Sequence, residues 1–294
     1  MAEKLIVHSV NNIKVLSINT WGIPLNLTKS QRLDTLCKEI KKLNPDVVLM
    51  QELWLKKDYD KVVNGCGYRY VTPYGPFIAI GKYSGLVTMS KYPIASIQKI
   101  NYRWKEKYFN IAKGALKTEI LFAGQKVAIF NTHLTANLEV ALGNEFNIFG
   151  KLMFTSDYEE VSRWDQLRTL TEHLNQTLNE GIPIILGGDL NTGPRYPLWC
   201  KWMTYMKDNF QDLFDSVSYI KGLPSTFNND LGHRDQGQLD HIIAFGKAKV
   251  IESKVVLTEK HNMCFLTKCE KLFVSDHFGL QSILAIPRSQ KCNL

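Results

Sequence analysis

The chain has 294 residues, of which 45% are hydrophobic and 22% charged, and its formal net charge is +8. This composition excludes a disordered or collagen-like chain, and the length allows one large α/β domain or two small ones. The positive charge favours an anionic partner, but it does not choose among nucleic acid, an acidic membrane surface and a phosphorylated small molecule.

The sequence shows no obvious membrane or export segment. No apolar stretch approaches the roughly 20 residues of a membrane-spanning helix, so we expect any membrane contact to be peripheral. The first residues, Met1 to Val7, lack the apolar segment of a signal peptide, which predicts a cytoplasmic protein by default and leaves non-classical secretion open. The six cysteines include no C-x-x-C pair and are expected to be free thiols, with a loop closed by Cys264 and Cys269 as the alternative.

The N-terminal part of the chain predicts a strand, a helix and a second strand. Residues 14–19 predict a strand that ends on Asn19. Ser30 could cap the helix that follows, whose apolar face is marked by residues at helical spacing: Leu33, Leu36, Ile40 and Leu43. The helix should end near Asn44, because the proline after it disfavours a helical conformation there. Residues 46–50 then predict a buried strand that leads into Glu52.

The middle of the chain combines predicted strands with one long helix. Four strands are expected, over residues 85–90, 94–100, 115–122 and 126–132. Ala123-Gly124 is a natural hairpin turn between the last two, and the second of them leads into His133. Apolar residues at helical spacing from Val161 to Leu178 predict a long amphipathic helix that Gly181 closes.

The most informative stretch begins at Ile184, where an apolar run reaches a glycine pair and then delivers Asp189 and Asn191. Such a run predicts a buried strand with a carboxylate and a carboxamide just beyond its end, although an ordinary strand and turn is an equal alternative. Residues 196–214 should be partly helical, and two more strands are expected over residues 239–245 and 280–286. Because no repeat or linker is found, we expect residues 1–294 to form a single domain.

Polar residues stand at the ends of most of these predicted strands. They are Asn19, Glu52, His133, Asp189, Asn191, Asp240, Asp276 and His277. If the strand ends meet on one rim, that rim carries acids, amides and two histidines, and their oxygens suit Mg²⁺, with Mn²⁺ as an alternative. This combination predicts hydrolysis of a phosphate ester by metal-assisted attack of water. Each residue alone could instead be a strand-end or turn residue without a catalytic role.

Six short motifs occur in an order that resembles the endonuclease/exonuclease/phosphatase superfamily. They are Asn19, Gln51-Glu52, Thr132-His133-Leu134, Gly188-Asp189-Leu190-Asn191, Leu239-Asp240 and Ser275-Asp276-His277. The resemblance extends from about residue 14 to residue 286. It implies an α/β (α+β) fold of the deoxyribonuclease I type, a four-layer α/β/β/α sandwich of two mixed β-sheets. It also implies that the single domain is a metal-dependent phosphoric diester hydrolase.

The resemblance further implies which residues bind the metal. Glu52, with Asn19 nearby, resembles the main metal site of the superfamily. Asp276 would add a contact to a second metal or a contact through water. We therefore expect Mg²⁺ as the cofactor, with Mn²⁺ possible.

The remaining strand-end residues are expected to carry the chemistry. Asp189 resembles the residue that activates or orients the attacking water, and Asn191 would hold it and the phosphate. His277 resembles the partner of the scissile phosphate, with Asp240 as the carboxylate that orients and charges it. His133 would lie across the phosphate, where it stabilises the transition state or assists the leaving oxygen. A histidine held by a carboxylate keeps one tautomer and is biased toward the cation, which suits a phosphate partner.

The sequence around Trp21-Gly22 narrows the resemblance to lipid hydrolases. A Trp-Gly pair after Asn19 resembles the neutral sphingomyelinases and the inositol-phosphosphingolipid phospholipases C, and so do three further stretches, residues 51–54, 84–86 and 90–94. This implies a sphingomyelinase or phospholipase C-type enzyme that acts, as a monomer, on a phospholipid at a membrane surface. The net charge keeps a Mg²⁺-dependent nuclease as the second hypothesis. A binding module without catalysis is a third, which the complete set of acids and histidines argues against.

Three aromatic-rich stretches could contact a membrane. They cover residues 102–109, 146–154 and 196–206. Packing in the core is the favoured interpretation for each of them, and stacking on a nucleic-acid strand is another alternative. His241 is next to Asp240 but should face the opposite side of the strand, so we expect it to be structural.

Overall fold

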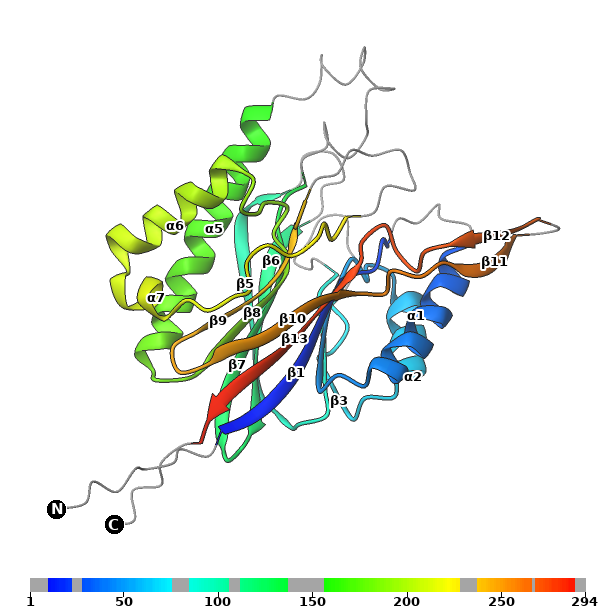
Figure 1. Ribbon diagram of the computed structural model, residues 1–294, viewed down its shortest axis with the longest axis horizontal. Coiled ribbons are helices and arrows are strands. Elements are labelled where there is room, and N and C mark those ends of the chain that lie inside the picture. The colour runs from blue at the N-terminus through cyan, green and yellow to red at the C-terminus, as the bar shows by residue number, and fades with distance from the viewer. Residues whose placement is uncertain are drawn as a thin grey trace.

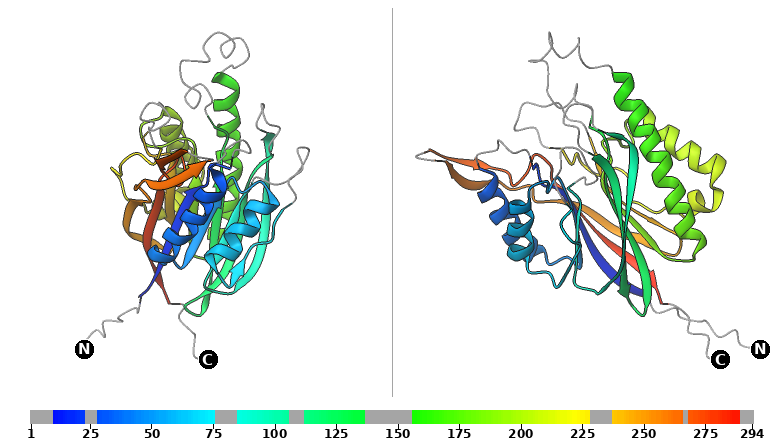
Figure 2. Two further views of the ribbon diagram at one scale, coloured as in Figure 1. Left: turned by 90° about the vertical axis from the view of Figure 1, so that its right-hand side faces the viewer. Right: turned by 180° about the vertical axis from the view of Figure 1, so that it is seen from behind.

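The computed structural model describes residues 10–22, 28–75, 85–105, 112–136, 156–227, 237–265 and 268–288. Two β-sheets lie face to face, and helices cover the outer side of each sheet (Figure 1). The other two views place the two groups of helices on opposite sides of the paired sheets (Figure 2). The predicted sandwich of two mixed sheets between helices is therefore confirmed.

The first sheet has six strands. They are β1 (Val10–Asn19), β2 (Val47–Gln51), β3 (Tyr70–Val71), β4 (Val87–Ser90), β10 (Lys249–Val256) and β13 (Gly279–Pro287). Their order across the sheet is β10–β13–β1–β2–β4–β3. β1 and β2 are parallel, with Asn19 opposite Gln51, so both strands bring their last residues to the same edge.

The second sheet has five strands in chain order. They are β5 (Ile94–Lys105), β6 (Ala112–Phe122), β7 (Gln125–His133), β8 (Ile184–Asp189) and β9 (Asp240–Phe245). β7 and β8 are parallel, and His133 is opposite Asp189. β9 runs antiparallel to β8 and begins at Asp240, which is also opposite Asp189. Three polar residues therefore stand side by side at one edge of this sheet.

Amphipathic helices close the two outer faces. The first sheet is covered by α1 (Lys29–Leu43) and α2 (Lys56–Cys66), and the second by α5 (Ser156–Asn179), α6 (Pro197–Asn209) and α7 (Gln211–Ser216). α1 ends at Asn44, as predicted, and this residue adopts a left-handed conformation with φ of 49°. The residue that precedes α1 is Thr28 rather than Ser30. Val161 is 54% exposed, so the apolar face of α5 begins after it.

The layer between the two sheets is largely apolar, and near the edge that carries the polar residues it holds a pair of buried amides, Asn131 and Gln51. Asn131 of β7 donates hydrogen bonds of 3.0 Å to the backbone carbonyl oxygens of Met50 and Val87. Its side-chain oxygen accepts a hydrogen bond of 2.8 Å from Nε2 of Gln51. Because Met50 and Gln51 belong to β2 and Val87 to β4, this single side chain links the two sheets.

Several elements were not predicted from the sequence. Besides α2, β3 and β10, they include the hairpin of β11 (His261–Phe265) and β12 (Lys268–Leu272). α2 buries only a few apolar residues, chiefly Tyr59 and Val62, which gives a weak helical pattern. Most residues of β10 are at least partly exposed, so the strand lacks the apolar run that marks the central strands.

The expectation that all cysteines are free thiols was wrong for one pair. Cys264 and Cys269 are opposite each other in the β11–β12 hairpin and form a disulfide, with their Cα atoms 4.0 Å apart. The hairpin register brings the two side chains together, and register is not visible in cysteine spacing alone. Cys37, Cys66 and Cys200 are free. Cys292 lies outside the described residues.

Within the described ranges, no helix combines the length and the apolar character that a bilayer-spanning segment needs.

Candidate active site

The polar residues predicted at strand ends come together at one edge of the sandwich. Asn19 ends β1, and Glu52 directly follows β2 in the first sheet. His133 ends β7, and Asp189 ends β8 in the second sheet. The parallel pairs β1–β2 and β7–β8 bring each pair of strand ends to one place, and the packing of the sheets joins the two places.

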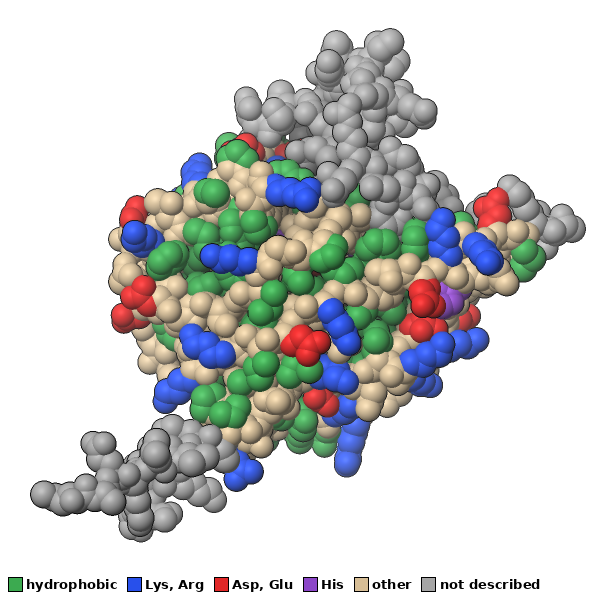
Figure 3. Space-filling view, in the orientation of Figure 1, with side chains coloured by type: hydrophobic (Ala, Val, Ile, Leu, Met, Phe, Trp, Pro, Cys, Tyr) green, Lys and Arg blue, Asp and Glu red, His purple; other side chains and the backbone are tan. Residues whose placement is uncertain are grey.

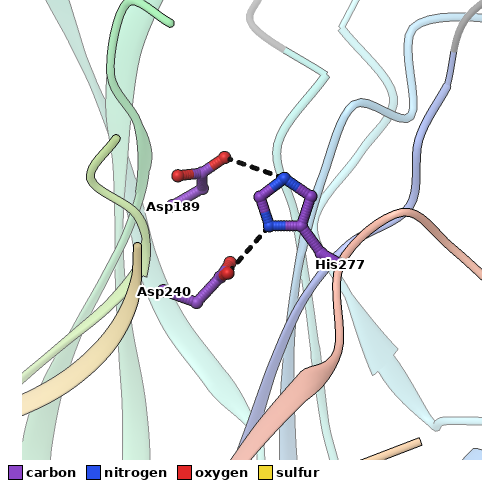
Figure 4. Close-up of side chains that lie close together, drawn as sticks. All are labelled: Asp189, Asp240 and His277. Atoms are coloured by element: carbon purple, nitrogen blue, oxygen red, sulfur yellow. Dashed lines mark hydrogen bonds and ion pairs between the residues drawn. The ribbon is translucent and has the colours of Figure 1, made fainter. Parts of the chain in front are cut away.

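His277 lies between two carboxylates (Figure 4). Its Nδ1 atom is 2.8 Å from Oδ2 of Asp240, and its Nε2 atom is 3.7 Å from Oδ2 of Asp189. All three side chains are buried: Asp240 is 0% exposed, Asp189 1% and His277 5%. The short contact on Nδ1 leaves Nε2 to face Asp189 and the centre of the site.

The Asp240–His277 pair is held by neighbouring segments. The hydroxyl of Thr226 accepts hydrogen bonds of 3.0 Å from the backbone N–H groups of Leu239 and Asp240. The ring of Phe227 meets the His277 ring edge to face, with centroids 5.1 Å apart. Both partners of the pair therefore contact the same short segment, Thr226 and Phe227, which no sequence pattern singled out.

Glu52 is held in a strained backbone conformation beside Asn19. Glu52 has φ of 66°, in the left-handed region that non-glycine residues rarely adopt. The side-chain nitrogen of Asn19 donates to Oε1 of Glu52 and to Oδ2 of Asp189, at 3.1 Å in both cases. The backbone N–H of Gly22 donates to Oε2 of Glu52 at 2.9 Å. A Cβ atom at Gly22 would lie 1.8 Å from the Glu52 carbonyl oxygen, which explains the glycine of the Trp-Gly pair.

His133 lies close to the carboxylates of Asp189 and Glu52. Its Nε2 atom is 3.6 Å from Oδ2 of Asp189 and 3.9 Å from Oε1 of Glu52. The amino group of Lys113 lies 3.2 Å from Nε2 and 3.4 Å from Nδ1 of the same ring. Lys113 is only 3% exposed. We did not predict this lysine, because a single lysine near the start of a strand usually faces solvent.

Burial raises the pKa of three carboxyl groups at the site, those of Glu52, Asp189 and Asp276. It raises the pKa of Asp189 to about 6, against the lowering influence of His277. It also raises the pKa of Asp276 to about 7 and that of Glu52 above its ordinary value. Removing carboxylates from water disfavours their charged form, and their mutual proximity adds to this effect.

The two histidines are shifted in opposite directions. Burial, followed by the positive charges of Lys113 and His277, lowers the pKa of His133 well below its ordinary value. Burial alone would also lower the pKa of His277, but Asp240 and Asp189 raise it well above the ordinary value. The site therefore holds a neutral imidazole and an imidazolium within reach of the same carboxylate.

Two further predicted residues lie at the margin of this group. Asn191 has φ of 46°, its backbone N–H donates to Oδ1 of Asp189 at 2.9 Å, and its side-chain nitrogen donates to the Leu134 carbonyl at 3.0 Å. Asp276 accepts a hydrogen bond of 3.2 Å from the hydroxyl of Ser275, and its charge acts on His277 and Glu52. Asn191 therefore holds Asp189, whereas Asp276 contributes charge.

The donor set fits a hard divalent cation. Four carboxylates, those of Glu52, Asp189, Asp240 and Asp276, converge on this edge, and carboxylate oxygens are the ligands that Mg²⁺ prefers. Ligand atoms of Asp189, Asp240 and His277 lie within 4.8 Å of one another. Oδ1 of Asp240 is buried and accepts no hydrogen bond from the described part of the chain. The predicted ligands Asn19, Glu52 and Asp276 form the neighbouring side of the same cluster.

His241 faces away from this site, as expected. Its Nε2 atom is 2.9 Å from the Thr192 carbonyl oxygen, and its ring stacks on Trp199 with centroids 4.5 Å apart. It is 1% exposed. His241 therefore supports the turn that follows Asp189.

The aromatic stretches expected near a membrane have different outcomes. In residues 196–206, Trp199 and Trp202 are buried in the core, so this stretch follows the alternative of core packing. Tyr102 is buried as well, and its hydroxyl lies 2.8 Å from that of Thr132. Residues 106–109 and 146–154 lie outside the described residues.

The sequence matches a known family over most of its length. The model of the Endonuclease/Exonuclease/phosphatase family matches residues 16–277. A candidate neutral sphingomyelinase of Drosophila melanogaster is 26% identical over 305 aligned residues, which cover 95% of this chain and 63% of that protein. An inositol phosphosphingolipids phospholipase C of Schizosaccharomyces pombe is 27% identical over 317 residues, which cover 95% of this chain and 70% of that protein. The chain thus spans about two thirds of the length of these relatives.

Solved structures share the fold. SmcL superposes with a TM-score of 0.70 at 18% identity, and the match covers 94% of this chain and 99% of SmcL. A variant of the beta toxin of Staphylococcus aureus, solved with bound magnesium ions, superposes with a TM-score of 0.68 at 16% identity. That match covers 92% of this chain and 99% of the toxin chain. At these identities the likeness concerns the architecture.

Proposed function

Because this chain belongs to the endonuclease/exonuclease/phosphatase family, we propose that it is a single-domain, metal-dependent phosphoric diester hydrolase whose substrate is sphingomyelin or a related phospholipid. The observation that carries the proposal is the pair of oppositely shifted histidines, His133 and His277, on either side of Asp189. A neutral imidazole and an imidazolium beside one carboxylate provide the proton acceptor and the cation that suit hydrolysis of a phosphodiester by water.

Asp189 is the residue that orients the attacking water. Its Oδ2 atom is central to the cluster, because Asn19 donates to it and both histidines lie within 4 Å of it. Oδ1 is fixed by the backbone N–H of Asn191. With its pKa raised to about 6, the carboxylate is a better proton acceptor than an exposed aspartate and is still largely ionised at neutral pH.

His277 binds the phosphate as a cation. Asp240 accepts a hydrogen bond from Nδ1, so Nε2 carries a proton that can be donated to a non-bridging phosphate oxygen. The negative charge that develops in the transition state then meets a positive charge in a water-poor site. Asp240 contributes by holding the ring and stabilising its charge.

His133 and Lys113 act on the other side of the phosphate. A neutral His133 cannot supply a positive charge, but the Lys113 amino group lies 3.2 Å from its Nε2 atom. Together they stabilise the departing oxygen. His133 orients this oxygen, and Lys113 supplies the positive charge.

A hard divalent cation completes the proposed site. Glu52 would hold it, with Asn19 and Asp276 beside it, and we propose Mg²⁺, with Mn²⁺ as an alternative. When bound, such an ion supplies positive charge that polarises the phosphate oxygens and offsets the crowded carboxylates. The strained Glu52 backbone and its contact with Gly22 serve to direct both carboxylate oxygens into the site.

The proposed substrate rests on the relatives and on the Trp-Gly pair. Both curated relatives carry the names of sphingolipid hydrolases, and Gly22 fits its place beside Glu52 for a steric reason. We propose that the protein meets its substrate peripherally, at a membrane surface, and acts as a monomer. A nuclease with the same site is the second candidate, which the net charge of +8 favours. On the face in Figure 3, however, Lys and Arg side chains are scattered among hydrophobic and acidic ones rather than gathered in one stripe.

The test is hydrolysis by the purified protein in Mg²⁺ and in EDTA. The substrates are sphingomyelin vesicles, plasmid DNA and single-stranded RNA, assayed side by side. We expect release of phosphocholine that EDTA abolishes and that added Mg²⁺ restores. Cleavage of nucleic acid alone would replace the lipid proposal with the nuclease. Activity on either substrate that persists in EDTA would refute the metal dependence.

A matched variant tests the mechanism. Asp189→Ala should abolish turnover, because it removes the acceptor at the centre of the site, while thermal unfolding shows that the fold is retained. Full activity of this variant would refute the role assigned to Asp189.

A further inference from the structure

Thr135, two residues after His133, has all three of its polar groups bound by one helix. Its backbone N–H donates to Oε1 of Gln166 at 2.9 Å, and its hydroxyl accepts from Nε2 of the same side chain at 2.8 Å. Its carbonyl oxygen accepts from Nη1 of Arg163 at 3.1 Å. Its hydroxyl also lies 3.2 Å from that of Ser162. We call Ser162, Arg163 and Gln166 of α5 the Thr135 clamp.

The clamp is a polar patch on the buried face of α5, next to a run of leucines. Leu167, Leu170 and Leu174 of the same helix are fully buried against the second sheet. Ser162 and Gln166 are also 0% exposed, and Arg163 is 6% exposed. Burying two polar side chains and a guanidinium costs free energy that leucine or alanine at these places would avoid.

Part of this cost is not recovered inside the clamp. Among the residues that the structure describes, none hydrogen-bonds the buried Nε of Arg163, and burial lowers the pKa of this guanidinium. A helix that served only to cover the sheet would not need this arrangement. We therefore interpret the three side chains of the clamp as groups that hold Thr135 in place.

Thr135 is linked by short contacts to three residues of the proposed site. The preceding residue, Leu134, donates its N–H to the backbone carbonyl of Asp189 at 3.0 Å. The Leu134 carbonyl accepts from the side chain of Asn191 at 3.0 Å. His133 precedes Leu134 directly and ends β7. A shift of Thr135 would thus move His133 and change the contacts that hold Asp189 and Asn191.

We propose that Ser162, Arg163 and Gln166 are positioning residues for the hydrolytic site, which they align through Thr135. This inference rests on the proposed function. α5 belongs to the outer layer, so the clamp acts on catalysis chiefly by fixing where the residues around His133 lie, and the charge of Arg163 also interacts with that of Asp189. Misplacement of a catalytic group by about 1 Å can lower a rate by roughly 100-fold.

The test compares two variants of α5. Gln166→Met keeps the length of the side chain and removes both of its hydrogen bonds to Thr135. Thr171→Val is the matched control, because it also removes one buried hydrogen-bonding group from α5. The Thr171 hydroxyl accepts from Nε1 of Trp202 at 2.8 Å and has no part in the clamp. Both variants leave one buried N–H group without an acceptor, so their losses of stability should be similar.

Steady-state kinetics with Mg²⁺ separate alignment from stability. The probes are sphingomyelin in mixed micelles and the soluble diester bis(p-nitrophenyl) phosphate. We expect Gln166→Met to lower kcat by roughly 10- to 100-fold with little change in KM, and Thr171→Val to leave both unchanged. Thr135→Ser, which retains all three polar groups, should keep kcat, whereas Thr135→Val should lower it. Equal losses in Gln166→Met and Thr171→Val, or an unchanged kcat in Gln166→Met, would overturn the proposal.

Amide hydrogen exchange keeps this test apart from the test of the proposed function. Exchange in the segment that contains Leu134 and Thr135 should accelerate in Gln166→Met and not in Thr171→Val. If the wild-type protein cleaves neither probe, the proposed function fails, and exchange then decides the clamp. Unchanged protection of this segment in Gln166→Met would overturn the clamp whether or not the wild-type protein is active.

Discussion

The Nδ1 atom of His277 lies 2.8 Å from Oδ2 of Asp240, and this contact joins two different sheets. Asp240 begins β9 of the five-stranded sheet, whereas His277 precedes β13 of the six-stranded sheet. The raised pKa of His277 is therefore a property of the assembled sandwich. Neither sheet alone would hold this histidine as a cation.

Replacing Asp240 tests this relationship. Asp240→Asn removes the charge that contributes most to raising the pKa of His277, so the pKa of His277 should fall. We expect kcat to drop by roughly 10²- to 10⁴-fold and the alkaline limb of the pH–rate profile to move to lower pH. Asp215→Asn, on the exposed surface of α7, is the control for loss of one negative charge. An alkaline limb at the wild-type position would contradict the role of Asp240.

Replacing Lys113 tests the charge beside His133. Lys113→Met keeps much of the apolar stem and removes the amino group 3.2 Å from His133 Nε2. We expect kcat to fall by roughly 10²- to 10³-fold, as for loss of one preorganised donor. The pKa of His133 should rise, because after burial the charge of Lys113 is the main cause of its lowering. Kinetics and NMR titration of the ring protons measure the two effects.

The control for this variant is Lys247→Met, which removes an exposed lysine from a turn. It should retain the wild-type kcat and the wild-type titration of His133. A Lys113→Met enzyme with the kcat of this control would show that the lysine has no part in turnover.

His241 predicts a loss of stability toward acidic pH. Burial lowers its pKa from 6.5 to about 4. Between these values the unfolded chain binds a proton that the folded protein does not, so the free energy of unfolding falls as pH decreases from 6.5 toward 4. The loss from this residue amounts to about 3 kcal/mol at the acidic end.

The variant His241→Phe should separate this contribution. It loses the hydrogen bond to Thr192, so it should be less stable than the wild type at pH 7, but its stability should fall less between pH 6.5 and pH 4. Urea unfolding at several pH values measures both. Parallel stability curves for the two proteins would show that His241 does not titrate in this way.

Replacing Trp202 tests whether the aromatic stretch in α6 lies in the core or contacts a membrane. The side chain is 0% exposed and its Nε1 donates to the hydroxyl of Thr171. Trp202→Phe should lower the free energy of unfolding by about 1–3 kcal/mol, because it leaves a small cavity and loses the hydrogen bond that Trp202 donates to Thr171. Sedimentation with sphingomyelin vesicles should show unchanged binding. A clear loss of vesicle binding without loss of stability would place this residue at the membrane.

Sequence patterns predicted much of the fold and most of the site, for a physical reason. β1, β2, β7 and β8 lie in the interior, so they appear as apolar runs, and each run ends at a polar residue. The positions of Asn19, Glu52, His133 and Asp189 followed from these ends. Their convergence needed the parallel pairing of the strands, which the order of the motifs indicated.

The residues that were missed depend on partners that strand pairing or helix packing brings to them. The role of Lys113 depends on its contact with His133, which lies twenty residues later in the adjacent strand of a hairpin. Gln166 is polar on an apolar helix, and its partner Thr135 lies 31 residues earlier. The disulfide between Cys264 and Cys269 depends on the register of a hairpin whose strands are short and lack a strong apolar pattern. Such pairings become visible only when the strands and helices are assembled.

The three hydrogen bonds of Asn131 have a consequence for how the enzyme could fail. Apolar faces of two sheets can slide over each other at little cost, because hydrophobic contact has no preferred direction. Asn131 makes directional bonds from β7 to β2 and β4, next to the strand ends that carry Glu52 and His133. Asn131 therefore fixes the position of one sheet relative to the other, and each sheet carries part of the proposed catalytic residues. A protein without the Asn131 side chain could retain its secondary structure and most of its stability. The catalytic residues of its two sheets would then no longer be aligned with each other.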